Sequence, residues 1–131
     1  MVQRDLRARG IADEAVLSAF MEIPRERFLP ESCLAEAYDD HPLPIGHGQT
    51  ISQPLVVAMM VRELRCQPHH RVLDVGAGSG YQSAILARLA RMLRIDAPNE
   101  PKMRYCCWNS CMRVIVVDAP DVAPQVTSRP P

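Results

Sequence analysis

The sequence predicts an α/β fold in which a parallel β-strand is followed by a glycine-rich loop and a helix. Residues 72–75 are apolar except for Asp74, which is typical of a strand buried on both faces. Three glycines follow at alternate positions and allow a positive φ, namely Gly76, Gly78 and Gly80. From Tyr81 to Arg91 the apolar residues recur at spacings of three and four, as on one face of a helix.

Two helices are expected near the start of the chain. The first covers Val2–Arg9 and ends at Gly10, which suits a left-handed C-cap. The second begins after Asp13, a good N-cap, and ends before Pro24. Its expected apolar stripe consists of Val16, Leu17, Phe20 and Met21. We interpret both helices as scaffold.

A glycine-containing loop and a third helix are expected over residues 44–64. Leu55–Leu64 supplies the body of the helix, and Pro54 is tolerated in its first turn. Ser52 is a candidate N-cap for this helix. A cap is a sufficient explanation for this serine. A hydroxyl at a helix start beside the glycine loop would also point into the crevice, so a second role stays open.

The glycine spacing indicates the type of ligand. The pattern is Gly-x-Gly-x-Gly, not the Gly-x-Gly-x-x-Gly of dinucleotide sites, and no lysine follows as in a P-loop. Asp74 precedes the first glycine by two residues, near the carboxyl end of the strand, where open α/β sheets bind ligands. An acid there suits a cationic ligand better than a phosphate. A tight strand-to-helix turn without a ligand is the alternative interpretation.

Two motifs carry a resemblance to a known family. The pattern Asp-x-Gly-x-Gly-x-Gly over residues 74–80 resembles motif I of the S-adenosylmethionine-dependent methyltransferases. Gly46-His47-Gly48-Gln49-Thr50-Ile51-Ser52-Gln53-Pro54 resembles the signature of the protein-L-isoaspartate O-methyltransferase family. Residues 23–30 and 37–40 are similar to that family's lead-in to its substrate loop. The resemblance covers residues 1 to about 91 and implies a Rossmann-like methyltransferase fold.

The resemblance implies an activity and a set of site residues. Family members transfer a methyl group from S-adenosylmethionine to the free carboxylate of isoaspartyl residues in damaged proteins, a repair reaction. That carboxylate, with a pKa of about 4, is ionised at neutral pH, so the transfer needs no general base. By analogy Ser52 helps to orient the carboxylate and the cofactor, whereas His47 is a loop residue. The implied cofactor-binding residues are Thr50, Ile51, Asp74, Gly76, Gly78, Ser79 and Gly80.

The chain departs from the family pattern after about residue 91. The resemblance implies a second strand that ends in an acid, which binds the cofactor's ribose. Leu93–Asp96 is a very short candidate, and Val114–Val117 is a better strand whose Asp118 lies far beyond the usual interval of about 20 residues. We therefore expect residues 1–91 to be the amino-terminal part of the domain, truncated after the first strand–loop–helix unit. Residues 92–131 are expected to be a divergent, proline-rich and poorly ordered tail.

Composition excludes several classes of partner. The chain has 15 basic and 15 acidic residues and 5% aromatic residues, so neither nucleic acid nor an anionic membrane is expected to bind. The longest apolar run, Leu55–Val61, falls far short of the ~20 residues that span a bilayer, and no signal peptide is recognised. If the chain folds, we expect a monomer.

The cysteines predict a reducing compartment and no metal site. An odd number of cysteines without a signal sequence favours the cytoplasm. Cys106, Cys107 and Cys111 lack paired Cys-x-x-Cys spacing, so no zinc site is expected. Cys33 and Cys66 are interpreted as ordinary buried or partly exposed thiols.

Two rival functions stay open. One is a non-catalytic remnant that acts at most as a weak binding module. The other is a methyltransferase of small molecules, against which the Thr50–Pro54 segment argues.

Overall fold

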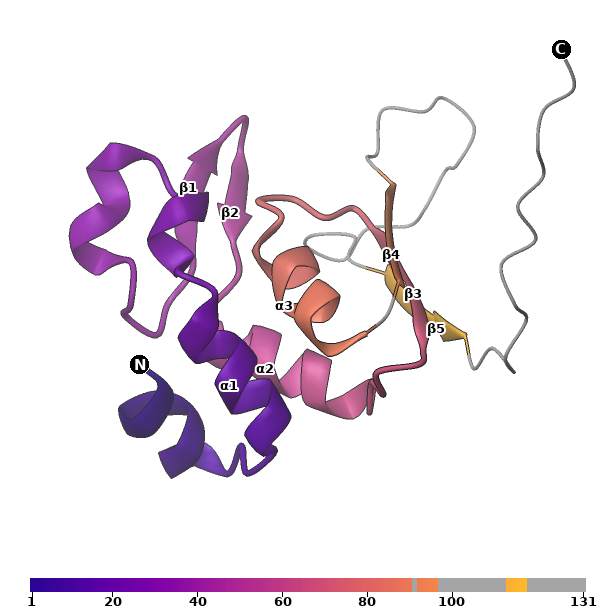
Figure 1. Cartoon of the computed structure of the whole chain (residues 1–131). Helices are drawn as coiled ribbons and strands as arrows, with labels where there is room; N and C mark the ends of the chain where they lie inside the picture. The colour runs from indigo at the N-terminus through magenta and orange to yellow at the C-terminus, as the bar shows by residue number, and fades with distance from the viewer. Residues whose placement is uncertain (91, 97–112, 118–131) are drawn as a thin grey trace, which may run out of the picture.

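The computed structural model describes residues 1–90, 92–96 and 113–117 (Figure 1). Its α-helices are α1 (Glu14–Glu22), α2 (Pro54–Glu63) and α3 (Tyr81–Leu89). Its strands are β1 (Leu43–Gly46), β2 (Gln49–Ile51), β3 (Arg71–Val75), β4 (Met92–Asp96) and β5 (Arg113–Val117). A π-helical turn at Val2–Leu6 and 3₁₀ turns at Arg7–Arg9, Arg25–Phe28 and Glu31–Glu36 complete the described elements. The predictions on Asp118, on Cys106, Cys107 and Cys111, and on the order of most of the tail lie outside the described residues.

The predicted strand is the centre of a small mixed sheet. β3 lies between β4 and β5, parallel to the first and antiparallel to the second. Val75 pairs with Asp96, so the carboxyl ends of β3 and β4 meet at the edge where the glycine loop begins. The candidate second strand therefore forms as β4. The described fold keeps the predicted strand–loop–helix unit and adds a short strand on either side of β3.

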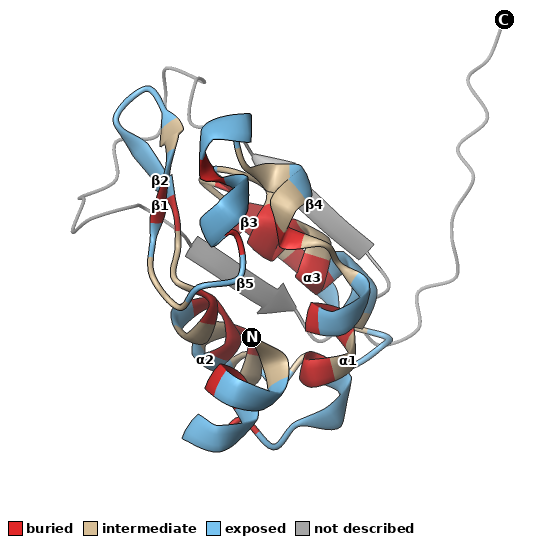
Figure 2. Cartoon of the chain, turned by 90° about the vertical axis from the view of Figure 1, so that its left-hand side faces the viewer, coloured by how far each residue is buried: buried red, intermediate tan, exposed pale blue. Residues whose placement is uncertain are grey.

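The core lies where the three α-helices and β3 meet (Figure 2). α3 contacts both α1 and α2, and it precedes β4. Fully buried apolar side chains come from every one of these elements: Leu17 and Phe20 from α1, Val57 and Ala58 from α2, Val72 from β3, and Ile85 and Leu86 from α3. Burial of this set drives the packing that fixes the glycine loop and the segment before α2 in space.

A hairpin forms where the sequence analysis expects only a loop. β1 and β2 pair antiparallel, with Leu43 opposite Ile51. Gly46 ends β1, and His47 and Gly48 form the turn; the three residues have φ of 92°, 51° and 68°. Glycine adopts a positive φ without strain, and histidine is one of the few other residue types enriched there. His47 is a turn residue, as predicted.

The predicted caps of the first helices are confirmed. The Asp13 carboxylate accepts hydrogen bonds from the amides of Ala15 and Val16, at 3.0 and 3.1 Å. Gly10 ends the first helical segment with φ 89° in the left-handed region. The prediction for Met21 is wrong, because its side chain is 61% exposed. Phe20 already faces the core, and the next residue lies more than a quarter turn further round the helix.

Replacement of Asp13 tests the cap. Asp13→Ala should lower the free energy of unfolding by about 1 kcal/mol, because two amides at the start of α1 lose their acceptor. Asp13→Asn is the matched control, since it keeps a side-chain oxygen and should lose much less. Chemical denaturation monitored by circular dichroism gives both values. Equal stability of the two variants would contradict the cap.

Candidate cofactor and substrate site

The glycine loop (Gly76–Gly80) leaves β3 in a conformation that only glycine adopts without strain. Gly76, Gly78 and Gly80 have φ of 79°, 56° and 81°. The Gly80 amide donates to the Ala77 carbonyl at 2.9 Å, which closes the turn before α3. Gly78 is exposed, whereas Gly76 and Gly80 are partly buried. The Cβ position of Gly78 has only the Gly76 carbonyl nearby, at 3.9 Å, which leaves room for close approach by a ligand, whereas that of Gly80 lies 3.9 Å from the Phe28 ring.

Asp74 is completely buried at the end of β3. The Ser83 hydroxyl of α3 donates to its Oδ2 at 2.6 Å, and Oδ1 has no partner among the described residues. Burial raises the pKa of Asp74, and the hydrogen bond from Ser83 opposes this rise. A buried carboxylate oxygen without a donor is costly. It therefore marks a place where a donor from a ligand would be stabilising.

Ser79 has a structural role at the start of α3. Its Oγ accepts a hydrogen bond from the Tyr81 amide at 3.2 Å. That contact satisfies one of the amides that a helix start leaves without a partner. Any role of Ser79 toward a cofactor would come in addition to this one.

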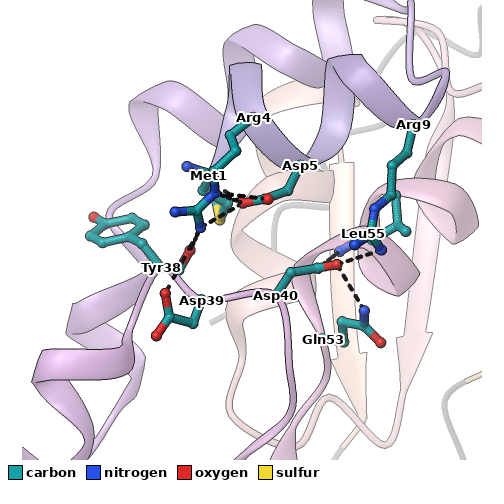
Figure 3. Close-up of polar contacts among 9 residues, drawn as sticks. All are labelled: Met1, Arg4, Asp5, Arg9, Tyr38, Asp39, Asp40, Gln53 and Leu55. Atoms are coloured by element: carbon teal, nitrogen blue, oxygen red, sulfur yellow. Dashed lines mark hydrogen bonds and ion pairs between the residues drawn. The ribbon is translucent and has the colours of Figure 1, made fainter.

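Ser52 does not cap α2, which corrects one prediction. The residue before the helix is Gln53, and the helix start has no cap from its own neighbouring side chains. The cap comes from Asp40, whose Oδ1 accepts from the Leu55 amide at 3.0 Å (Figure 3). The local sequence predicts Ser52 as the cap because it cannot reveal an acceptor that lies 15 residues before the capped amide. The half-buried Ser52 hydroxyl therefore stays without a hydrogen-bond partner in the described part of the chain.

Asp40 joins three parts of the chain. Besides capping α2, its Oδ2 accepts from Arg9 Nη1 and from Gln53 Nε2, both at 2.9 Å (Figure 3). The carboxylate side chain is only 8% exposed. Hydrogen bonds to a buried charged group are stronger than neutral ones. Asp40 thus holds the residue next to Ser52 and the first turn of α2 against the amino-terminal segment.

Arg25 connects the two predicted motifs. Its Nη1 donates to the Ser52 carbonyl at 2.8 Å, and its guanidinium carbon lies 5.2 Å from the centroid of the Tyr81 ring. Tyr81 is the first residue of α3, directly after the glycine loop. Phe28, from the same 3₁₀ turn as Arg25, packs on the Tyr81 ring at 5.4 Å between centroids. The Ser52 segment and the start of α3 are therefore linked through one 3₁₀ turn.

Thr50 and Ile51 lie on β2 in different surroundings. Thr50 is exposed and pairs with Pro44, whereas the Ile51 side chain is 2% exposed and belongs to the core. Contacts of Ile51 with a ligand would thus come from its backbone. Thr50 is free to present its hydroxyl.

Arg25, Asp40 and Ser83 are not among the site residues predicted from the sequence. Arg25 sits in a charged run with Glu26 and Arg27 that has the pattern of a surface turn, yet it is fully buried. Asp40 and Ser83 act over distances in sequence that local patterns do not encode. The one signal that includes Arg25 and Asp40 is the resemblance of residues 23–30 and 37–40 to the lead-in segment of the family.

Other surface features contain none of the predicted site residues. A groove of about 170 Å³ between α1 and α3 is lined by Ala15, Ser18, Ala19, Glu22, Arg88 and Leu89. In the described part of the chain, no cluster of three or more His, Cys, Asp or Glu side chains is arranged to hold a metal ion. None of the described helices has the length and apolar character needed to cross a membrane. Cys33 is buried and Cys66 is partly buried, and both are free thiols, as predicted.

The fold and the loop define the chain as part of an α/β methyltransferase of the Rossmann-like class. Two solved structures of similar architecture support this class. One is a Plasmodium falciparum chain assigned as a protein-L-isoaspartate O-methyltransferase and solved in complex with S-adenosyl-L-homocysteine, with TM-score 0.57, 34% identity and coverage of 66% of this chain and 39% of that one. The other is a protein-L-isoaspartate O-methyltransferase with TM-score 0.61, 32% identity and coverage of 72% and 32%.

The family follows from the sequence comparisons. The model of the protein-L-isoaspartate(D-aspartate) O-methyltransferase family (PCMT) matches residues 1–98, and the chain belongs to this family. The Methanoculleus marisnigri enzyme is 57% identical over 90 residues, which cover 69% of this chain and 41% of the relative. Protein-L-isoaspartate O-methyltransferase 2 of an Anaeromyxobacter species is 58% identical over 90 residues, which cover 69% of this chain and 37% of the relative. The chain therefore spans about two fifths of the length of these curated relatives.

Replacement of Asp40 tests the cap of α2. Asp40→Ala should lower the free energy of unfolding by about 1–3 kcal/mol, because the partly buried donors of Gln53 and Leu55 and the exposed donor of Arg9 lose their acceptor. Asp39→Ala is the matched control, since the neighbouring carboxylate is exposed and lies 3.8 Å from Arg4. Urea denaturation of both variants gives the comparison. A similar loss in the two variants would show that Asp40 is not a cap.

The pH dependence of stability tests the burial of Asp74. Because the folded chain holds the Asp74 proton to a higher pH than the unfolded chain, the contribution of this group to stability falls as pH rises from about 4 through its raised pKa. Asp74→Asn does not titrate, so its melting temperature should rise relative to the parent over that window. Thermal melts at several pH values test this, with Asp39→Asn as the exposed control. A pH-independent difference for Asp74→Asn would contradict the prediction.

Proposed function

We propose that this chain binds S-adenosylmethionine at the glycine loop and methylates the free carboxylate of isoaspartyl residues in damaged proteins. The observation that carries the proposal is the unpartnered Oδ1 of buried Asp74 beside three glycines of positive φ. Membership of the PCMT family supports the reaction, and the S-adenosyl-L-homocysteine complex of the Plasmodium falciparum relative supports the cofactor.

The described residues fit such a cofactor. S-adenosylmethionine supplies an electrophilic methyl group on a sulfonium and carries a cationic amino group. The backbone of Gly76, Gly78 and Gly80 would pack against it, and Asp74 would supply an acceptor and a negative charge. Thr50, Ile51 and Ser79 would complete the pocket, as the resemblance implies. Of the two candidate ribose acids, Asp96 is the better one, because β4 ends beside Val75 at the same edge of the sheet.

On the substrate side, Ser52 would orient the reacting carboxylate. Its hydroxyl has no hydrogen-bond partner in the described structure, while its carbonyl is held by Arg25. The isoaspartyl carboxylate is ionised at neutral pH, so this chain needs only to place it in line with the methyl group. His47 is an exposed turn residue and has no part in this proposal.

A second proposal is a non-catalytic remnant that acts at most as a weak binding module. The departure of the sequence from the family pattern after about residue 91 favours it, since the curated relatives match only about 90 residues of this chain. A remnant of this kind would keep the motifs without an assembled site. Methylation of a small molecule is less well supported, because the whole Thr50–Pro54 signature is present.

Several further expectations belong to this proposal. Residues 1–91 are proposed to be the amino-terminal part of the methyltransferase domain, and the chain is proposed to act as a monomer in the cytoplasm. Its partners would be isoaspartyl proteins and peptides, with no nucleic acid and no membrane. The proline-rich composition after residue 91 supports the boundary.

Calorimetric titration with S-adenosyl-L-homocysteine distinguishes the two proposals. A dissociation constant in the micromolar range, together with a cooperative thermal melt, would support the enzyme. In that case methylation of an isoaspartyl peptide should follow, and the normal aspartyl peptide is the matched control. A cooperative melt without binding would favour the binding module.

Ser52→Ala tests the serine in the active chain. Since Ser52 caps no helix, the melting temperature should stay unchanged, while turnover of the isoaspartyl peptide falls at least about tenfold through loss of positioning. Ser32→Ala, an exposed serine of the 3₁₀ turn Glu31–Glu36, is the control. Unchanged turnover in Ser52→Ala would exclude the orienting role.

A further inference from the structure

Arg25 is a buried cation that lacks a direct counter-ion. Its side chain is completely buried, and none of the described carboxylates forms an ion pair with it. Its oxygen contacts are main-chain carbonyls: Ser52 at 2.8 Å from Nη1, and His41 at 3.5 Å from Nη2. The face of the Tyr81 ring covers the guanidinium, and Nε has no partner among the described residues.

This arrangement is poor as a source of stability. Burial lowers the pKa of Arg25, while Tyr81 and Asp40 oppose that shift. An apolar side chain at a buried charged position often stabilises a fold as well or better. An arginine adds direction instead, because its planar fork donates along fixed lines and stacks on aromatic rings. Here the guanidinium of Arg25 donates to the Ser52 carbonyl and lies over the ring of Tyr81, the first residue of α3.

We propose that Arg25 is a positioning residue that sets the place of Ser52 relative to the start of α3 and hence to the glycine loop. Its consequence for catalysis rests on the proposed function, whereas its consequence for backbone order does not. Ser52 is held on both sides, its own carbonyl by Arg25 and the next side chain, Gln53, by Asp40. The backbone of Ser52 is therefore fixed, while its hydroxyl stays available to a substrate.

Hydrogen exchange tests the effect of Arg25 on backbone order without any substrate. In Arg25→Met, the amides of residues 49–53 and of Leu55 should exchange at least about tenfold faster, while those of α1 keep their protection. Arg25→Lys keeps the charge but not the planar fork, and should give an intermediate rate. Arg27→Met is the matched control from the same 3₁₀ turn, because Arg27 is exposed.

If the parent chain is active, enzyme kinetics test the effect of Arg25 on catalysis. Misplacement of Ser52 should lower kcat for an isoaspartyl peptide by about a hundredfold in Arg25→Met. Affinity for S-adenosyl-L-homocysteine should fall much less than kcat, because the glycine loop keeps its own Gly80–Ala77 hydrogen bond and only the contacts from Thr50 and Ile51 are loosened. A merely structural role would instead lower cofactor affinity, kcat and melting temperature together.

Each outcome decides the proposal. Local loss of protection at residues 49–55 supports it even if the parent chain neither binds cofactor nor methylates, in which case only the proposed function fails. Unchanged exchange at residues 49–55 in Arg25→Met overturns it, as does a parent chain without protection there. Uniform loss of protection, or unfolding of both Arg25→Met and Arg25→Lys, makes Arg25 a structural residue and also overturns it.

Discussion

Burial of the Tyr81 ring is the constraint on which the arrangement of the site depends. Tyr81 is the first residue of α3, and its ring meets Phe20 of α1 edge-on at 5.9 Å and Phe28 at 5.4 Å between centroids. Its hydroxyl has no partner in the described structure, so aromatic packing outweighs the cost of that unpaired group. Because Tyr81 follows Gly80 directly, any packing that fixes the ring also fixes the end of the glycine loop.

Two polar contacts join segments that lie far apart in the sequence. Asp40 caps a helix that begins 14 residues later, and the Arg88–Glu22 ion pair joins α3 to α1. A local cap would stabilise α2 in any position, whereas the cap from Asp40 stabilises it only when the preceding loop is in place. The helix and the loop are thus specified together, which is what a site shared between distant segments requires.

Local sequence patterns predict the secondary structure well. They do not predict the side chains that form contacts between segments distant in the sequence. The strand 71–75, the three glycines and α3 follow from hydrophobic period and backbone freedom, and Asp13 and Gly10 follow from capping rules. The hairpin before α2 escapes prediction because its strands are short and Ile51 alone shows clear burial on β2. Arg25 escapes it because composition ranks arginine among exposed residues, and only the tertiary fold supplies carbonyls and an aromatic face to receive it.

The contact between Arg25 and Ser52 also bears on the order in which the chain folds. It closes a loop of 27 residues, whereas the turn within the glycine loop and the β1–β2 hairpin form between near neighbours. Loop closure costs entropy before a distant contact is gained, so short-range structure has a kinetic advantage. Each half of the site can therefore acquire its own local geometry early, and the two become a single site only at a late, cooperative step that desolvates the guanidinium.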